Sequence, residues 1–141
     1  MEDDFIIEHQ LTDNWRLTIN NLFDRKKEDD ALMYTTNDKT LRMNVWNYPD
    51  KTKDEILEDK KAEIKERNSD NEIIKKYELD QGNRIKVGYH IKEYDQQKDI
   101  TYNLICGFCI ADNEVLQTFF YFDDEKDLEW ALNTWKQITY K

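Results

Sequence analysis

Alternating apolar residues in the second half of this 141-residue chain constrain its fold more than any other feature. Apolar side chains occupy nearly every second position from Arg84 to Tyr94 and again from Ile100 to Ala111. A period of two places such side chains on one side of an extended chain, so both stretches are predicted to be β-strands. Residues 115–122 have apolar side chains at both odd and even positions, so both faces of this segment are apolar and it is expected to form a central strand. Short polar stretches separate these segments and predict an antiparallel meander.

The first half of the chain contains further strand candidates with weaker patterns. In residues 41–48, Leu41 and Met43 fall on one face, and Arg42 and Asn44 fall on the other. The charged stretch from Asp24 to Asp30 is too polar to pack and is expected to be an exposed loop. The predicted strands here are 5–8, 15–22, 31–35 and 41–48, and the meander of the second half begins with a strand at 73–79.

Two helices are expected. Thr52 and Glu55 have the spacing of a capping box, which predicts a helix from Lys53 to Arg67. Its apolar stripe is thin, so this helix is expected on the surface. A second helix is predicted from Glu125 to Thr139, with Trp130 on its solvated side and one apolar stripe, namely Leu128, Ala131, Leu132, Trp135 and Ile138.

The combined pattern predicts a single domain over residues 1–141. The fold class is α+β: an antiparallel sheet of about six strands, with a helix inserted after the fourth strand and a C-terminal helix.

Composition excludes several classes of function. The chain has 31 acidic and 21 basic residues and a net charge of −10, which argues against binding nucleic acid. No apolar run is long enough to span a membrane, so no membrane partner is expected. The acidic start, Met1 to Asp4, lacks the basic region of a signal peptide, which predicts a cytoplasmic protein.

No residue pattern indicates catalysis, a cofactor or a metal, and none is expected. Cys106 and Cys109 form a C-x-x-C pair within a predicted strand, where their thiols would point to opposite faces. Only two histidines, His9 and His90, and one serine, Ser69, are present. A hydrolase that uses paired carboxylates stays open as an alternative, because such pairs are assembled in space.

A polar face of the predicted sheet is the candidate binding surface. The residues opposite the expected core face share large or polar side chains, which are typical of interfaces. If the strands are neighbours, the partner-binding residues are Arg42, Asn44, Trp46, Tyr48, Lys86, His90 and Asn103. The alternative is that a loop or the N-terminal segment covers this face.

The acidic charge is concentrated toward both ends of the chain. The balance is −5 for residues 1–50, −1 for 51–100 and −4 for 101–141. Simple solubility explains such a distribution, and an acidic surface for a basic protein partner also explains it.

The whole pattern resembles a known fold family. A strand containing Trp15 and the strand Leu41-Arg42-Met43-Asn44-Val45-Trp46-Asn47-Tyr48 precede a helix, four antiparallel strands with Gly82 between the first two, and a helix containing tryptophan. This order is similar to the PsbP/Mog-like α/β/α sandwich and, within it, to the bacterial DcrB-like group.

The resemblance implies a non-enzymatic protein-binding module of a bacterial toxin or secretion system. An immunity protein that neutralises a toxin by direct binding is the first expectation. A cytoplasmic adaptor chaperone for a secreted effector is the alternative.

Overall fold

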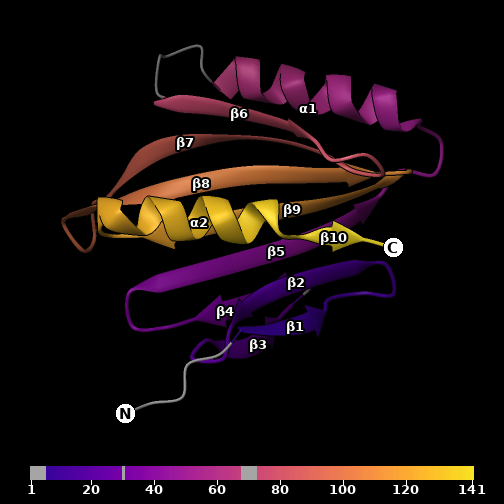
Figure 1. Ribbon diagram of the computed structural model, residues 1–141. Helices are drawn as coiled ribbons and strands as arrows, with labels where there is room; N and C mark the ends of the chain where they lie inside the picture. Colours follow the sequence, from indigo (N-terminus) through magenta and orange to yellow (C-terminus); the bar gives the residue numbers. More distant parts are fainter. Residues whose placement is uncertain (1–5, 30, 68–72) are drawn as a thin grey trace.

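The computed structural model describes residues 6–29, 31–67 and 73–141, and Figure 1 shows their arrangement. These residues form two antiparallel sheets, two α-helices and a short 3-10 helix. In chain order, the elements are β1 (Ile6–Gln10), β2 (Trp15–Asn20), β3 (Asp24–Glu28), β4 (Ala31–Thr35), β5 (Lys39–Asn47), α1 (Lys53–Arg67), β6 (Lys75–Asp80), β7 (Ile85–Asp95), β8 (Ile100–Ala111), β9 (Glu114–Phe122), η2 (Glu125–Asp127), α2 (Leu128–Lys136) and β10 (Thr139–Tyr140).

The main sheet has seven strands in the order β3-β4-β5-β9-β8-β7-β6. It consists of two meanders, β3 to β5 and β6 to β9, joined where β5 pairs with β9 in antiparallel register. This pairing places Leu41 opposite Phe120 and Asn44 opposite Gln117. The smaller sheet has the order β1-β2-β10, so the first and the last strand of the described chain flank β2 on its two sides.

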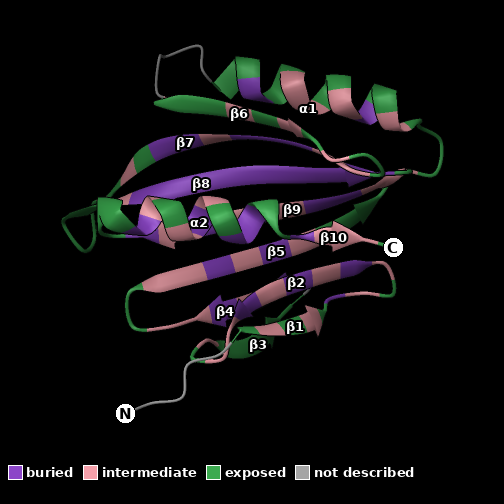
Figure 2. Cartoon of the chain, viewed as in Figure 1, coloured by how far each residue is buried: buried purple, intermediate pink, exposed green. Residues whose placement is uncertain are grey.

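The larger core lies between the main sheet, the small sheet and α2 (Figures 1 and 2). Its largest fully buried side chains include Trp15, Trp135 and Tyr34. The main sheet contributes alternate residues of β5, β8 and β9, namely Leu41, Met43, Ile105, Cys109, Ala111, Leu116, Phe120 and Phe122. We call this side of the sheet the α2 side.

A second, smaller core lies on the opposite side, which we call the α1 side. Ile56 and Ile64 are the buried residues of α1, and they pack with Val87, Cys106 and Phe108. Helix α1 contacts β7 and β8. Strands β7 and β8 are therefore covered on both sides, as the almost continuous burial of β8 in Figure 2 shows.

The α+β class is confirmed, but the strand count and the helix position differ from the expectation. The sheet has seven strands, the first two strands form a separate sheet with β10, and α1 follows the fifth strand. The extra strand is β3, which replaces the expected loop from Asp24 to Asp30. All its residues are exposed, and its backbone pairs with β4 at the sheet edge, where charged side chains are tolerated. Phe5 and Asp30 lie outside the described residues.

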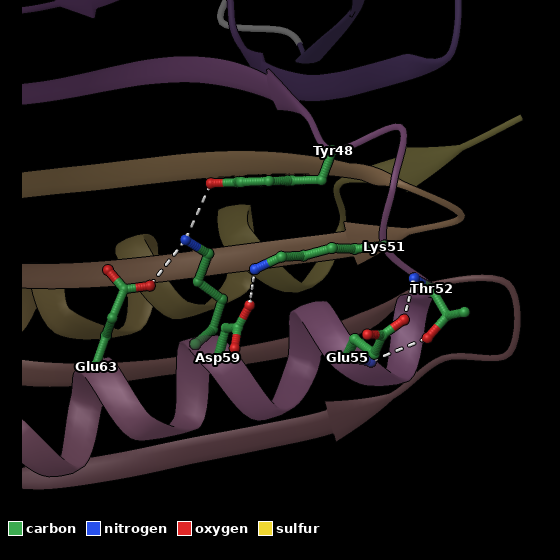
Figure 3. A network of polar contacts seen from close by, with 7 residues as sticks. Tyr48, Lys51, Thr52, Glu55, Asp59 and Glu63 are labelled. Carbon is green, nitrogen blue, oxygen red and sulfur yellow. Dashed lines mark hydrogen bonds and ion pairs between the residues drawn. The ribbon is translucent and has the colours of Figure 1, made fainter.

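The first helix begins and ends where the sequence predicts. The predicted capping box is present: Glu55 N donates to Thr52 Oγ1 at 3.2 Å, and Thr52 N donates to Glu55 Oε1 at 3.1 Å (Figure 3). The C-terminal helix is shorter than predicted, because it begins as η2 and ends at Lys136. Residues 139–140 form β10 instead.

The sequence pattern predicts Trp130 on the solvated side of the helix, and this prediction is wrong. Its ring is half-buried, stacks on Phe23 with 5.4 Å between ring centroids, and meets Phe120 edge-on at 5.6 Å. The strand pairing of β5 with β9 brings Phe120 under the helix, and this contact could not be inferred from helical periodicity alone.

Candidate functional site

Within residues 6–29, 31–67 and 73–141, one part of the main sheet has no helix packed over its α1 side. Among the described residues, α1 packs mainly over β7 and β8 and makes no comparable contact with β4, β5 or β9. Only Val115 and Phe119 of β9 reach the smaller core beneath it. Register places Met33, Arg42 and Phe119 in one row across these strands, and Asn44 and Gln117 in the next. We call this surface the open face and define it as Met33, Arg42, Asn44, Trp46, Gln117, Phe119 and Tyr121.

Trp46 is the most exposed aromatic residue of the open face, with 49% of its surface accessible. It lies near the end of β5, and its indole Nε1 donates a hydrogen bond to Gln117 Oε1 at 3.3 Å. The other members of the open face are half-buried. An exposed indole supported by a neighbouring amide has the features of an interface anchor, which presents apolar area and a polar handle together.

Tyr48 marks the boundary between the open face and α1 (Figure 3). Lys60 of α1 donates from Nζ to the Tyr48 hydroxyl at 3.3 Å and forms an ion pair with Glu63 at 2.8 Å. The same Nζ lies 5.3 Å from the centre of the Tyr48 ring. Tyr48 is half-buried and packs against the smaller core, so its side chain lies along the edge of the open face next to α1.

A polar cavity of about 360 Å³ lies at the opposite end of the open face. Tyr102 and Tyr121 line it and meet edge to face, with 5.6 Å between ring centroids. Tyr102 donates a hydrogen bond to Glu93 Oε2 at 3.1 Å. The remaining lining is polar or charged except for Ile100, and consists of Thr36, Asn37, Asp38, Lys39, Thr40, Asp95, Lys98, Ile100 and Asp123.

The structure separates the seven predicted binding residues into two groups. Arg42, Asn44, Trp46 and Tyr48 do lie on the α1 side, as the alternation of their strand requires. The predicted neighbours from β7 and β8 lie on the α2 side, under the C-terminal helix, and are buried: Lys86 is 0%, His90 6% and Asn103 4% exposed. The prediction that all seven share one surface is therefore wrong.

The three buried residues have internal partners. Lys86 Nζ donates to the carbonyl oxygens of Lys136 at 2.9 Å and Ile138 at 2.8 Å, so it binds one free C-terminal carbonyl of α2 and one from the segment that follows the helix. His90 Nε2 lies 3.0 Å from Asn103 Oδ1. The Lys86 bonds attach the C-terminal end of α2 to β7, and the His90 contact joins β7 to β8. All three side chains are buried, so they leave no surface for a partner.

The two cysteines lie on opposite faces of β8, as predicted. Cys106 belongs to the smaller core and Cys109 to the larger one. Burial raises the pKa of the Cys106 thiol to about 11 and that of Cys109 to about 12. Both thiols are protonated at neutral pH and are poor nucleophiles there.

Other chemistry has little support in the described part of the chain. No group of three His, Cys, Asp or Glu side chains there is placed to hold a metal ion. Ser69 lies outside the described residues. Within the same ranges, neither α1 nor α2 is long and apolar enough to cross a membrane.

Sequence reasoning missed the contribution of β9 to the open face. Residues 115–122 are apolar at both parities, so the strand reads as buried on both sides. The pairing of β9 with β5 is the information that assigns these residues to the open face. In this register, Gln117, Phe119 and Tyr121 share a side of the sheet with Arg42 and Asn44.

Comparisons with known proteins support the fold and add no function. No family model matches the chain, and no curated protein matches it. A crystal structure at 1.50 Å resolution of a protein from Bacteroides thetaiotaomicron VPI-5482 is similar, with a TM-score of 0.67 and 11% sequence identity. The similarity covers 90% of this chain and 45% of that chain, so this chain spans less than half of that protein's length. At this identity the likeness shows a shared fold alone.

Proposed function

We propose that this protein is a non-enzymatic binding module that engages a protein partner through its open face. The observation that carries the proposal is the position of Trp46, which leaves 49% of its surface accessible and belongs to neither core. Leaving a large apolar side chain in water gains nothing for folding, whereas tryptophan is enriched among residues that dominate interface energetics.

Within this class, we propose an immunity protein of a bacterial toxin system. The net charge of −10 suits fast association with a basic partner. The sequence resemblance to the DcrB-like group supports the same class of role. The proposed mechanism is occlusion: the protein covers a functional surface of the toxin and performs no reaction on it.

An adaptor chaperone is the second candidate, and one observation favours it. Arg42 is the single charged member of the open face, while Trp46, Phe119 and Tyr121 are aromatic. A surface of this composition is better suited to bind an apolar segment of an effector than to bind the strongly basic surface of a toxin.

The main experiment is co-expression with a candidate toxin. The proposal predicts a toxin-like reading frame directly upstream of the gene. Its product, co-expressed with this protein, is expected to co-purify with it and to lose its toxicity. Trp46→Ala is expected to weaken the complex by about 2 kcal/mol or more, roughly thirty-fold in Kd.

Tyr94→Ala is the matched control, because Tyr94 is 57% exposed but has the parity of His90 and so lies on the α2 side. It is expected to leave affinity unchanged, and both variants are expected to melt close to the wild type. Equal losses of affinity in the two variants, or loss of folding in Trp46→Ala, would contradict the proposal.

Salt dependence separates the two candidate roles. For an immunity protein guided by charge, the association rate is expected to fall steeply with salt, because exposed charges are screened over about 8 Å at physiological ionic strength. A rate that stays flat favours the chaperone.

A further inference from the structure

A crevice of about 280 Å³ lies on the α2 side of the main sheet, where the turn after β1 meets β3, β4 and β5. It is separate from the open face, because the sheet lies between them. Its lining consists of Leu11, Thr12, Arg25, Lys27, Leu32, Met43, Val45 and Leu116.

The floor of this crevice is apolar. Register places Leu32 opposite Met43 and Val45 opposite Leu116, so four side chains form one continuous patch. Met43 and Leu116 are 2% and 1% exposed, whereas Val45 is 37% exposed. The crevice is therefore deep at Met43 and opens to solvent at Val45.

The rim is positively charged although the chain is strongly acidic. Arg25 and Lys27 alternate along β3 and pair with Tyr34 and Leu32, so both side chains lie on the crevice side of the sheet. Arg25 contacts the Gln10 carbonyl at 3.4 Å and lies 5.9 Å from the centre of the Tyr34 ring. No acidic side chain is among the eight lining residues.

We propose that this crevice binds a small amphiphilic carboxylate, with its apolar chain on the Met43 floor and its carboxylate between Arg25 and Lys27. An apolar pocket with a few convergent polar groups is the usual form of a small-molecule site. At about 30 Å³ for each water-sized unit, the volume accommodates roughly ten non-hydrogen atoms. A guanidinium and an ammonium at the rim select an anionic head group.

The test uses octanoate as the probe and the methionine methyl groups as reporters. Met43 lines the crevice, whereas Met33 lies on the opposite side of the sheet. In protein labelled with ¹³C at the methionine methyl groups, octanoate is expected to shift the Met43 signal to saturation. For a ligand of this size, the expected dissociation constant is about 1 mM. The Met33 signal is expected to stay in place.

Two comparisons test the charge of the rim. Octylamine has the same chain with a positive head, and it is expected to bind at least about tenfold more weakly. The double variant Arg25→Gln, Lys27→Gln is expected to lose octanoate binding by a similar factor, because it removes both positive charges of the rim. Both side chains are exposed, so the double variant is expected to melt close to the wild type. Lys26→Gln, on the same strand but facing the other side, is the matched control.

Four results would overturn the proposal. The first is a Met43 signal that does not saturate. The second is an equal response of Met33 and Met43, which would indicate general adsorption. The third is equal affinity for octanoate and octylamine. The fourth is unchanged affinity in the double variant.

Discussion

At the scale of single residues, Trp135 determines how the C-terminal helix sits on the sheet. Its ring is fully buried and lies over Gly88 and Gly107, which are paired on the adjacent strands β7 and β8. A Cβ built on Gly107 would lie 2.4 Å from Trp135 Nε1 and 2.9 Å from Thr118 Oγ1. The absence of a side chain at this position is therefore a packing requirement.

Gly107→Ala is expected to lower the free energy of unfolding by about 1–3 kcal/mol, the usual cost of overpacking a core. Urea denaturation measures it. In a Trp135→Phe background the smaller ring leaves room, so the added cost of Gly107→Ala is expected to shrink. An equal cost in both backgrounds would mean that the clash with the indole is not the cause.

Lys86 gives a second prediction, which concerns pH. Burial lowers its pKa from 10.5 to about 8. Between these two values the unfolded chain binds more protons at this residue than the folded chain does, so stability from this group rises with pH over that window. Below about pH 8 the amine of Lys86 is charged in both the folded and the unfolded state. The full cost of burying that charge then lowers the free energy of unfolding.

Comparison of the wild type with Lys86→Met tests this effect. The wild type is expected to gain up to about 3 kcal/mol relative to the variant as pH rises from 8 toward 10.5. Both proteins retain Cys106 and Cys109, whose raised pKa values cause a loss of stability at high pH in each. Urea denaturation at successive pH values provides the measurement, and a constant difference between the two proteins contradicts the prediction.

At the scale of elements, α1 depends on its cap and on two isoleucines. Ile56 and Ile64 are its buried residues, and the rest of the helix is largely exposed and charged. With so little buried area, a larger share of its stability comes from local interactions. The reciprocal bonds of Thr52 and Glu55 are local interactions of this kind at its N-terminus.

Thr52→Ala is expected to cost about 1 kcal/mol, since it removes the hydroxyl that accepts from Glu55 N. Amide hydrogen exchange is expected to speed up in the first turn of α1 and to stay unchanged in β8. Thr101→Ala is the control, because Thr101 is exposed on a strand and caps no helix. Equal losses of stability in both variants would argue against a capping role.

At the scale of the whole molecule, a net charge of −10 on 141 residues acts against the compact state. Like charges repel more strongly when the chain is folded, and this repulsion weakens as salt shortens the screening length from about 30 Å at 0.01 M to about 8 Å at 0.15 M.

The melting temperature is therefore expected to rise between these two salt concentrations at neutral pH. Glu58→Gln combined with Glu66→Gln removes two exposed acidic charges from α1 and is expected to reduce the dependence on salt. A melting temperature that falls with added salt would show that attractive ion pairs outweigh the net repulsion.

The sequence by itself determined the local structure. Alternation along the strands predicted that Leu41 and Arg42 lie on opposite faces of β5 and that the two thiols of β8 lie on opposite sides. The capping box predicted the start of α1. These features depend on neighbours along the chain, and a period of two or a spacing of three residues records them directly.

Only the tertiary structure decided which faces share a surface. Arg42 and Lys86 both alternate with apolar residues in their strands, yet Arg42 belongs to the open face and Lys86 is buried under α2. Alternation within a strand fixes relative orientation only, and shifting a strand by one residue exchanges its two faces. The pairing of β5 with β9, which brings together residues about 75 positions apart, sets that register, and no local pattern encodes it.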